Sequence, residues 1–467
     1  MKIFKRLVVV IFSVTGIVVS IHDSAAQTPR PNIIFILADD LGWSSLSERM
    51  DPDDPRSVSD YHETPNLARL AARGMRLTRG YASAAICSPS RRSILFGQTP
   101  ARQGDERFAE THNPLTTSHE TLPVMLKKID PRYRTAHYGK WDMRAGFSPE
   151  DAGYDESDGD TGNRHGDVIS DKSERFTAVF AQEDPKRAFT LAQRANNFME
   201  RQVRQGSPFY LQISHYATHV DVQAREATLD KFANKVRGEK DDHAPFAAML
   251  HDLDNAIGQV LAKVEALGIA DNTYIFFMAD NGGTEFFPPV RNRLDHPDKF
   301  GRMMRNYPLR GGKWTLYEGG IRVPFIVAGP GIRPGSSSAV PVTGWDLLPT
   351  FRSLAGGKAS GNEVLDGGSF ADILKNAGRG KVDRPSRALV FHRYNNSYPH
   401  SAIIDGDYKL IRFWKTGKTE LYNLAGDPGE RTNIIDKQKN RARTLEKELV
   451  AYLKTVNPEL IHQYKTP

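Results

Sequence analysis

Two pairs of oxygen-bearing side chains follow apolar runs and could share a metal ion. Asp39-Asp40 comes directly after one such run, and Asp280-Asn281 comes after another. Because ligands gather beyond the carboxyl ends of strands in α/β sheets, we expect the two pairs to face one another. Such oxygens suit a hard cation, Ca²⁺ or Mg²⁺, with a further ligand still to be supplied. Either pair alone could be an ordinary turn, since Asp, Asn and Gly are common there.

Cys87 is the only cysteine of the 467 residues, so it has no partner for an internal disulfide. Pro89 and Ser90 follow it and can begin a helix. Cys87 would then sit at the positive end of the helix dipole, where an anionic substrate is favoured, with Arg91 one turn further along. The alternative for a lone cysteine is a small buried hydrophobe.

The segment 87–97 reads Cys-x-Pro-Ser-Arg, with leucine and glycine following, and resembles the signature of the formylglycine-dependent sulfatases. Segments 32–42, 308–324 and 421–433 resemble the opening strand and metal pair of that family, its lysine-bearing loop, and the closing segment of its bacterial members. These are the type I, arylsulfatase-like enzymes of the alkaline phosphatase superfamily. In them a formylglycine-generating or sulfatase-maturating enzyme oxidises the cysteine to an aldehyde, whose hydrate binds the metal and acts as the nucleophile.

The resemblance implies a role for each matching residue of this chain. The implied calcium ligands are Asp39, Asp40, Asp280, Asn281 and the modified Cys87. Arg91 would hold the hydrated aldehyde, and the sulfate oxygens would be gripped by Lys140, His219 and Lys313. Sulfuryl transfer spreads negative charge over the sulfate oxygens and the departing alcohol, so a metal with several fixed cations stabilises that state most. His219 or Lys313 would protonate the leaving oxygen. Taken singly, the lysines read as surface charges and the histidine as a structural hydrogen-bonder.

One position departs from the family pattern. The family has Gly-Lys-Trp-His, whereas this chain has Gly139-Lys140-Trp141-Asp142. The family histidine contacts the second hydroxyl of the nucleophile and helps to expel sulfate. Our hypothesis is that Asp142 serves as the base instead, because a carboxylate can accept the same proton. Its negative charge near the sulfate would weaken anion binding.

Three further residues are candidates for substrate contact. His215 lies four residues before His219, and it either shapes the pocket or ends a strand. Arg393 and His400 belong to a cluster of polar and aromatic residues that suits a sugar ring with charged substituents. The cluster could equally be the surface of a hairpin.

The elements that position these residues alternate along the chain. Strands are expected at 32–37, 135–138, 209–214, 274–279 and 323–328, and helices at 65–74, 188–201, 246–267 and 345–354. This alternation predicts an α/β fold, with a large mixed, mostly parallel sheet sandwiched by helices. Later segments at 388–391, 401–404, 408–413 and 420–422 predict a smaller C-terminal antiparallel sheet, and 438–453 a helix that packs on it.

The N-terminus has the layout of a cleavable signal peptide, with basic residues, an apolar run and Ser24-Ala25-Ala26. We therefore expect a signal peptide at 1–26, a catalytic α/β domain at 27–356 and a C-terminal subdomain at 357–467. An uncleaved anchor is the alternative. No later segment is apolar enough to span a membrane, so the mature protein is expected in the periplasm or outside the cell.

The bulk composition is that of an ordinary globular protein, with 39% hydrophobic and 25% charged residues. The net charge of +7 suits an anionic substrate, but without a dense basic run it does not indicate nucleic-acid binding. Together the observations predict hydrolysis of a sulfate ester on a carbohydrate. The alternatives are a phosphate or phosphonate ester hydrolase of the same superfamily, and a non-catalytic binder of sulfated glycans with unmodified Cys87.

Overall fold

The structure is a computed structural model, and it describes residues 29–103, 120–144, 146–166, 179–285, 305–358, 364–394 and 398–457. The signal peptide expected at 1–26 lies outside the described residues. Within them, no helix is both long and apolar enough to cross a bilayer.

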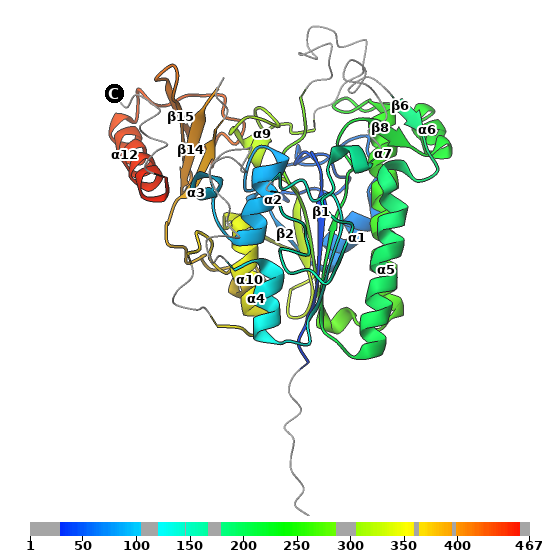
Figure 1. Cartoon of the computed structure of the whole chain (residues 1–467). Helices are drawn as coiled ribbons and strands as arrows, with labels where there is room; N and C mark the ends of the chain where they lie inside the picture. Colours follow the sequence, from blue (N-terminus) through cyan, green and yellow to red (C-terminus); the bar gives the residue numbers. More distant parts are fainter. Residues whose placement is uncertain are drawn as a thin grey trace, which may run out of the picture.

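A large sheet of eight strands forms the centre of the fold, in the order β11-β2-β10-β9-β1-β7-β4-β5 (Figure 1). Neighbouring strands from β9 to β5 run parallel, whereas β10 is antiparallel to both of its neighbours. The strands are β1 (Asn32–Ala38), β2 (Met75–Leu77), β4 (Arg134–Gly139), β5 (Glu156–Ser157), β7 (Phe209–Ser214), β9 (Thr273–Ala279), β10 (Phe325–Ala328) and β11 (Ser336–Ser338). The predicted mixed, mostly parallel sheet is confirmed.

The central strands are buried on both faces because helices cover the sheet from both sides. Every residue of β1 and β9 is buried, which explains why these strands read as continuous apolar runs. In Figure 1, helices α2, α4 and α10 lie on one side of β1, and α1, α5 and α7 lie on the other. Their bounds are α1 (Pro65–Arg73), α2 (Cys87–Phe96), α4 (Leu122–Ile129), α5 (Ala188–Gln205), α7 (Ala244–Ala266) and α10 (Leu347–Leu354).

The C-terminal part contains the expected four-stranded antiparallel sheet, β13-β14-β15-β16. One face packs against α12, where Val390 and Leu410 join Leu445 and Leu449 in a buried cluster. The other face packs against the part of the chain that contains the large sheet, in a buried cluster that includes Leu316. The elements are β13 (Leu389–Arg393), β14 (His400–Asp405), β15 (Tyr408–Phe413), β16 (Thr419–Asn423) and α12 (Lys439–Val456). The predicted small sheet and terminal helix are confirmed.

Shorter elements connect these layers. They are β3 (Gly80–Tyr81), α3 (Pro100–Gln103), β6 (Val179–Ala181), β8 (Val222–Ala224), α6 (Glu226–Ala233), α9 (Glu318–Ile321), β12 (Val342–Thr343) and α11 (Ala371–Lys375). Two of them matter for the site: β3 leads toward Cys87, and α9 ends the loop that carries Lys313.

Candidate active site

Helix α2 places Cys87 at its first turn, beside the carboxyl ends of β1 and β9. Ile86 is the extended N-cap residue, and Gly97 ends the helix with a left-handed φ of 64°. All ten residues of α2 are buried, although half of them are serines and arginines. The Cys87 thiol lies 3.3 Å from Asp39 Oδ1 and 3.8 Å from Asp40 Oδ1. The helix therefore delivers the cysteine directly to the carboxylates that follow β1.

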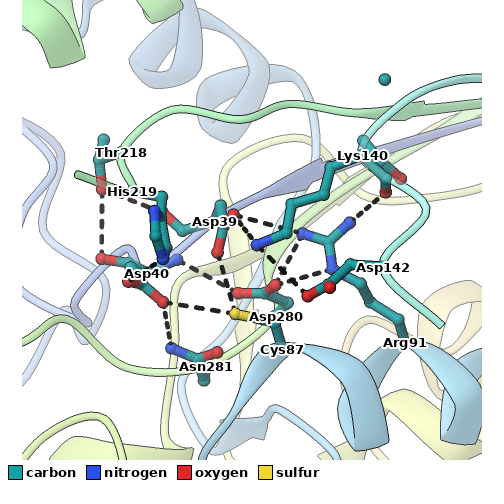
Figure 2. A network of polar contacts seen from close by, with 12 residues as sticks. Asp39, Asp40, Cys87, Arg91, Lys140, Asp142, Thr218, His219, Asp280 and Asn281 are labelled. Carbon is teal, nitrogen blue, oxygen red and sulfur yellow. Dashed lines mark hydrogen bonds and ion pairs between the residues drawn. The ribbon is translucent and has the colours of Figure 1, made fainter. Parts of the chain in front are cut away.

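Four side chains converge in a geometry that can hold a metal ion (Figure 2). One potential ligand atom from each of Asp39, Asp40, Cys87 and Asp280 lies within 4.8 Å of the others, and all four residues are buried. Asn281 donates through Nδ2 to Asp40 Oδ1 at 2.8 Å, while its buried Oδ1 accepts no hydrogen bond from any of the described residues. A buried amide oxygen without a donor is costly unless a cation or water completes it. The residues present therefore fit a hard divalent cation with oxygen ligands.

Three cations surround the carboxylates. Lys140 Nζ lies 2.5 Å from Asp39 Oδ2, and Lys313 Nζ lies 2.7 Å from Asp40. Arg91 donates to Asp280 Oδ2 through Nε at 3.0 Å and Nη2 at 2.7 Å. Lys313 Nζ also lies 3.5 Å from Cys87 Sγ. The site thus collects fixed positive charge around the sulfur, which is the environment that an anionic ester requires.

Burial and charge together set the ionisation of this cluster. Burial alone would raise the pKa of Asp39, but Lys140, His219 and Arg91 outweigh it and lower that pKa. Burial, together with Asp39, raises the pKa of Asp280 to about 7. Burial, Asp280 and Asp39 raise the pKa of the Cys87 thiol well above its usual value. An unmodified Cys87 would therefore remain a thiol at neutral pH and would be a poor nucleophile.

His219 reaches the same site from the segment after β7. Its Nδ1 lies 2.7 Å from the Val220 carbonyl oxygen, which can only accept, so Nδ1 carries the proton. Its Nε2 lies 3.9 Å from Asp40 Oδ2. Burial and the neighbouring Lys313 lower the pKa of His219 to about 4, which leaves the imidazole neutral above that pH. Thr218, to which the sequence analysis gave no role, donates its hydroxyl to the backbone carbonyls of Asp39 and Asp40.

Asp142 lies at the edge of this charge cluster, with a left-handed φ of 49°. Its Oδ2 accepts from Ser88 Oγ at 3.2 Å and lies 3.6 Å from Lys140 Nζ, while Oδ1 accepts from Arg144 at 3.2 Å. Burial opposes its ionisation, but Lys140 and Arg144 lower its pKa below the ordinary value. Ser88 is a contact that the sequence analysis missed, because it occupies the variable position of the Cys-x-Pro-Ser-Arg motif.

The three residues expected to contact substrate are held in different ways. His400 is buried, and both of its ring nitrogens face backbone groups: Nε2 accepts from Leu316 N at 3.1 Å, and Nδ1 lies 2.8 Å from the Tyr398 carbonyl. Arg393 donates to the Trp314 carbonyl. The ring of His215 is buried and hydrogen-bonds to none of the described residues, and burial lowers its pKa to about 4.

The comparisons with known proteins agree with this geometry. A family model described as Sulfatase matches residues 31–357. The chain belongs to the sulfatase family. A second model, described as N-sulphoglucosamine sulphohydrolase, C-terminal, matches residues 312–458 of the sulfatase. This range takes in both the Lys313 loop and the small sheet.

Curated relatives cover most of the sulfatase chain. It is 31% identical over 445 residues to N-acetylgalactosamine-6-sulfatase of Mus musculus, covering 88% of this chain and 78% of the relative. It is 27% identical over 516 residues to a sulfatase of Formosa agariphila, covering 93% and 90%. The chain is therefore a sulfatase, a hydrolase of sulfate esters.

Solved structures share the fold over nearly the whole chain. Ps i-CgsB in complex with k-i-k-neocarrahexaose superposes with a TM-score of 0.72 at 23% identity, covering 91% of this chain and 93% of that one. BT4656 in complex with its substrate D-glucosamine-2-N,6-O-disulfate superposes with a TM-score of 0.67 at 21% identity, covering 92% and 98%. The predicted architecture is thus the sulfatase fold.

Proposed function

We propose that this sulfatase removes sulfate from a sulfated poly- or oligosaccharide, using a formylglycine made from Cys87 and a bound Ca²⁺. The observation that carries the proposal is the convergence of Cys87 with Asp39, Asp40 and Asp280 within 4.8 Å. Beside them lies Asn281 Oδ1, which has no hydrogen-bond donor within the described part of the chain. When bound, the cation supplies Lewis acidity toward a sulfate oxygen and toward the nucleophile.

The remaining chemistry falls to the side chains of the chain. Arg91, held by Asp280, orients the modified Cys87 side chain and offsets negative charge. Lys140 and Lys313 bind sulfate oxygens, with His219 beside them. Above about pH 4 the pKa of His219 leaves its ring neutral, with its one N–H proton bonded to the Val220 carbonyl. Lys313 stays protonated because its pKa is raised, so we assign proton donation to the leaving alcohol to Lys313. Burial lowers the pKa of Lys313, but the negative charge of Asp40 outweighs burial and raises that pKa.

Asp142 is proposed as the base that assists expulsion of sulfate from the modified Cys87. It stays ionised through the working pH range, because its pKa is lowered, and it already accepts hydrogen bonds from Ser88 and Arg144. A carboxylate of low pKa is a weak base, so this assistance is modest in size.

A carbohydrate substrate is supported by the names of the relatives and by the molecules bound in similar structures. The Mus musculus relative is an N-acetylgalactosamine-6-sulfatase. The two similar structures hold a carrageenan oligosaccharide and a sulfated glucosamine. The signal-like N-terminus supports export to the periplasm or the medium, where such glycans are met. His215 remains a proposed contributor to the substrate pocket. Arg393 and His400 are proposed to shape that pocket indirectly, through their bonds to the backbone of Trp314 and Leu316. We also propose that 27–356 forms the catalytic domain and 357–467 the C-terminal subdomain.

Two measurements test the proposal. Mass spectrometry of the Cys87 peptide from the native host should show formylglycine, and activity should scale with the converted fraction. A panel of defined sulfated saccharides, with matched aryl sulfate and aryl phosphate esters, should show hydrolysis of the sulfates. Faster hydrolysis of the aryl phosphate would move the activity to phosphate esters. A thiol at every Cys87 would remove the nucleophile and leave a glycan-binding protein.

A further inference from the structure

The loop that carries Lys313 is fixed to the catalytic domain on one side. The Lys313 backbone N–H donates to the Gly283 carbonyl at 3.1 Å, and the Trp314 N–H donates to the Ala85 carbonyl at 2.8 Å. These bonds attach the loop to the segments that lead to Cys87 and away from β9. They leave the residues after Lys313 facing the C-terminal sheet.

The first two strands of the C-terminal sheet each hold one residue of this loop. At the end of β13, the Arg393 guanidinium donates to the Trp314 carbonyl. At the start of β14, His400 Nε2 accepts the Leu316 N–H at 3.1 Å. The His400 ring is stacked on Phe413 of β15, with ring centroids 5.6 Å apart. Both contacts join a side chain of the sheet to the backbone of the loop, so they constrain the path of the chain.

The other two strands hold the next two residues. Tyr317 donates its hydroxyl to Glu420 Oε2 of β16 at 2.8 Å. Lys409 of β15 lies 3.0 Å from Glu318 Oε1, and neither side chain is exposed to solvent. Each of the four strands therefore contributes at least one polar side chain that contacts the segment 314–318, directly after Lys313.

A closed ionic cluster locks the end of this segment. Lys409 Nζ also lies 2.9 Å from Glu430 Oε1, and Glu430 Oε2 accepts the Glu318 N–H at 2.6 Å. Tyr81 donates to Glu318 Oε2 at 3.0 Å. Buried ion pairs contribute little net stability, but separating the partners is costly because it leaves an unpaired buried charge. The cluster therefore specifies where the loop ends relative to the sheet.

We propose that Arg393, His400, Lys409 and Glu420 are positioning residues for Lys313. By holding the segment 314–318, the C-terminal sheet fixes the position of a sulfate-binding lysine. The inference rests on the role proposed for Lys313 in sulfate binding. It gives Arg393 and His400 a function through the loop. Small displacements matter here, because a misplacement of about 1 Å at a reacting centre can cost roughly 100-fold in rate.

A matched pair of substitutions at His400 isolates the hydrogen bond. In His400→Gln the amide oxygen can take the place of Nε2 and accept the Leu316 N–H. In His400→Asn the shorter side chain can reach the Tyr398 carbonyl in place of Nδ1, but it cannot reach Leu316. Both variants lose the ring that stacks on Phe413, so a purely structural effect is common to the two.

The experiment measures amide hydrogen exchange over residues 313–322 and the affinity for inorganic sulfate by calorimetry, in the full-length metal-loaded protein. Peptides from β14 and β15 report on the stability of the sheet itself. In His400→Asn we expect exchange of 313–322 to rise and sulfate affinity to fall by roughly tenfold or more. In His400→Gln we expect both quantities to stay within about threefold of the wild type, since the buried acceptor is kept.

Equal sulfate affinities in the two variants, or unchanged exchange of 313–322 in His400→Asn, would overturn the proposal. A parallel rise in exchange across β14 and β15 in both variants would also overturn it, since the effect would then be general destabilisation. If the wild type neither binds sulfate nor hydrolyses sulfate esters, the role of Lys313 fails. The exchange pattern still decides whether the sheet holds the loop.

Discussion

Replacement of Asp142 by Asn tests the residue at which this chain leaves the family pattern. The substitution keeps the shape of the side chain and removes its charge and its capacity to act as a base. Asp39 lies 2.5 Å from Lys140 Nζ and Asp142 lies 3.6 Å from it, so Lys140 keeps its closer carboxylate in the variant. The lysine should therefore stay in place, and the main loss should fall on proton transfer.

The size of the loss follows from the ionisation of Asp142. General acid-base catalysis contributes roughly 10²- to 10⁴-fold, and a base whose pKa lies well below the working pH falls at the lower end. We expect kcat to decrease by about 100-fold, which corresponds to about 2.7 kcal/mol of activation free energy. Because Lys140 and Arg144 overcome burial and lower the pKa of Asp142, the wild-type pH profile should contain no step from this group above about pH 4.

The assay is steady-state hydrolysis of an aryl sulfate from pH 4 to 9, with rates expressed per converted Cys87. Arg144→Gln is the matched control, since Arg144 pairs with Asp142 but its side chain is 53% exposed. It should change kcat by less than about threefold, as expected for a screened surface pair. Asp142→His, which restores the family residue, should add a titration near pH 6.5. If Asp142→Asn keeps kcat within about twofold of the wild type, Asp142 is not the base.

Three further outcomes are expected. Removal of metal by a chelator should abolish turnover and lower the unfolding temperature, and added Ca²⁺ should restore both. Titration calorimetry should show that Asn281→Ala weakens Ca²⁺ binding roughly tenfold or more. Burial lowers the pKa of His137 and His392 to about 3 and that of His215 to about 4. Since the unfolded chain takes up these protons near pH 6.5, stability is full above that pH and falls as the pH drops toward 4. Each histidine costs about 2 kcal/mol at pH 5, so urea midpoints should decrease from pH 7 to pH 5, and less steeply in His392→Gln. A midpoint independent of pH over this range would contradict the burial of these rings. Lys409→Met should cost about 3–5 kcal/mol at pH 8, because Glu318 and Glu430 lose their shared cation. Burial raises the pKa of Glu430 to about 7, with Lys409 lowering it and Glu318 raising it further. At pH 6 much of Glu430 is therefore already neutral, so the loss of stability should be smaller. An equal loss at both pH values, measured by denaturant unfolding, would be inconsistent with a charged pair.

The buried strands could be predicted well from the sequence, because a strand that is buried on both faces consists of consecutive apolar residues. The expected strand 209–214 coincides with β7, and 32–37 differs from β1 by one residue. It did not predict β11, which consists of three serines and exists through its pairing with β2. The antiparallel orientation of β10 could not be predicted either, since the hydrophobic pattern of a strand does not reveal its orientation relative to its neighbours.

The site also contains residues whose positions the sequence could predict and contacts that it could not. Asp39, Asp40, Asp280 and Cys87 were expected to lie together because motifs end their strands and begin a helix, and the structure does bring them together. The backbone partners of Arg393 and His400 could not be predicted, because those contacts join segments about 80 residues apart in the chain. Local patterns do not carry such long-range pairings.

The burial of helix α2 has a consequence for the timing of maturation. Cys87 is 4% exposed, and its sulfur lies under Asp39, Lys313 and the rest of a wholly buried helix. Any enzyme that modifies Cys87 must reach this sulfur, and the folded chain leaves it covered. The conversion of Cys87 that we propose would therefore have to precede folding. A molecule that folds first would keep its thiol. The active fraction of a preparation would then depend on the rate of Cys87 oxidation relative to the rate of folding.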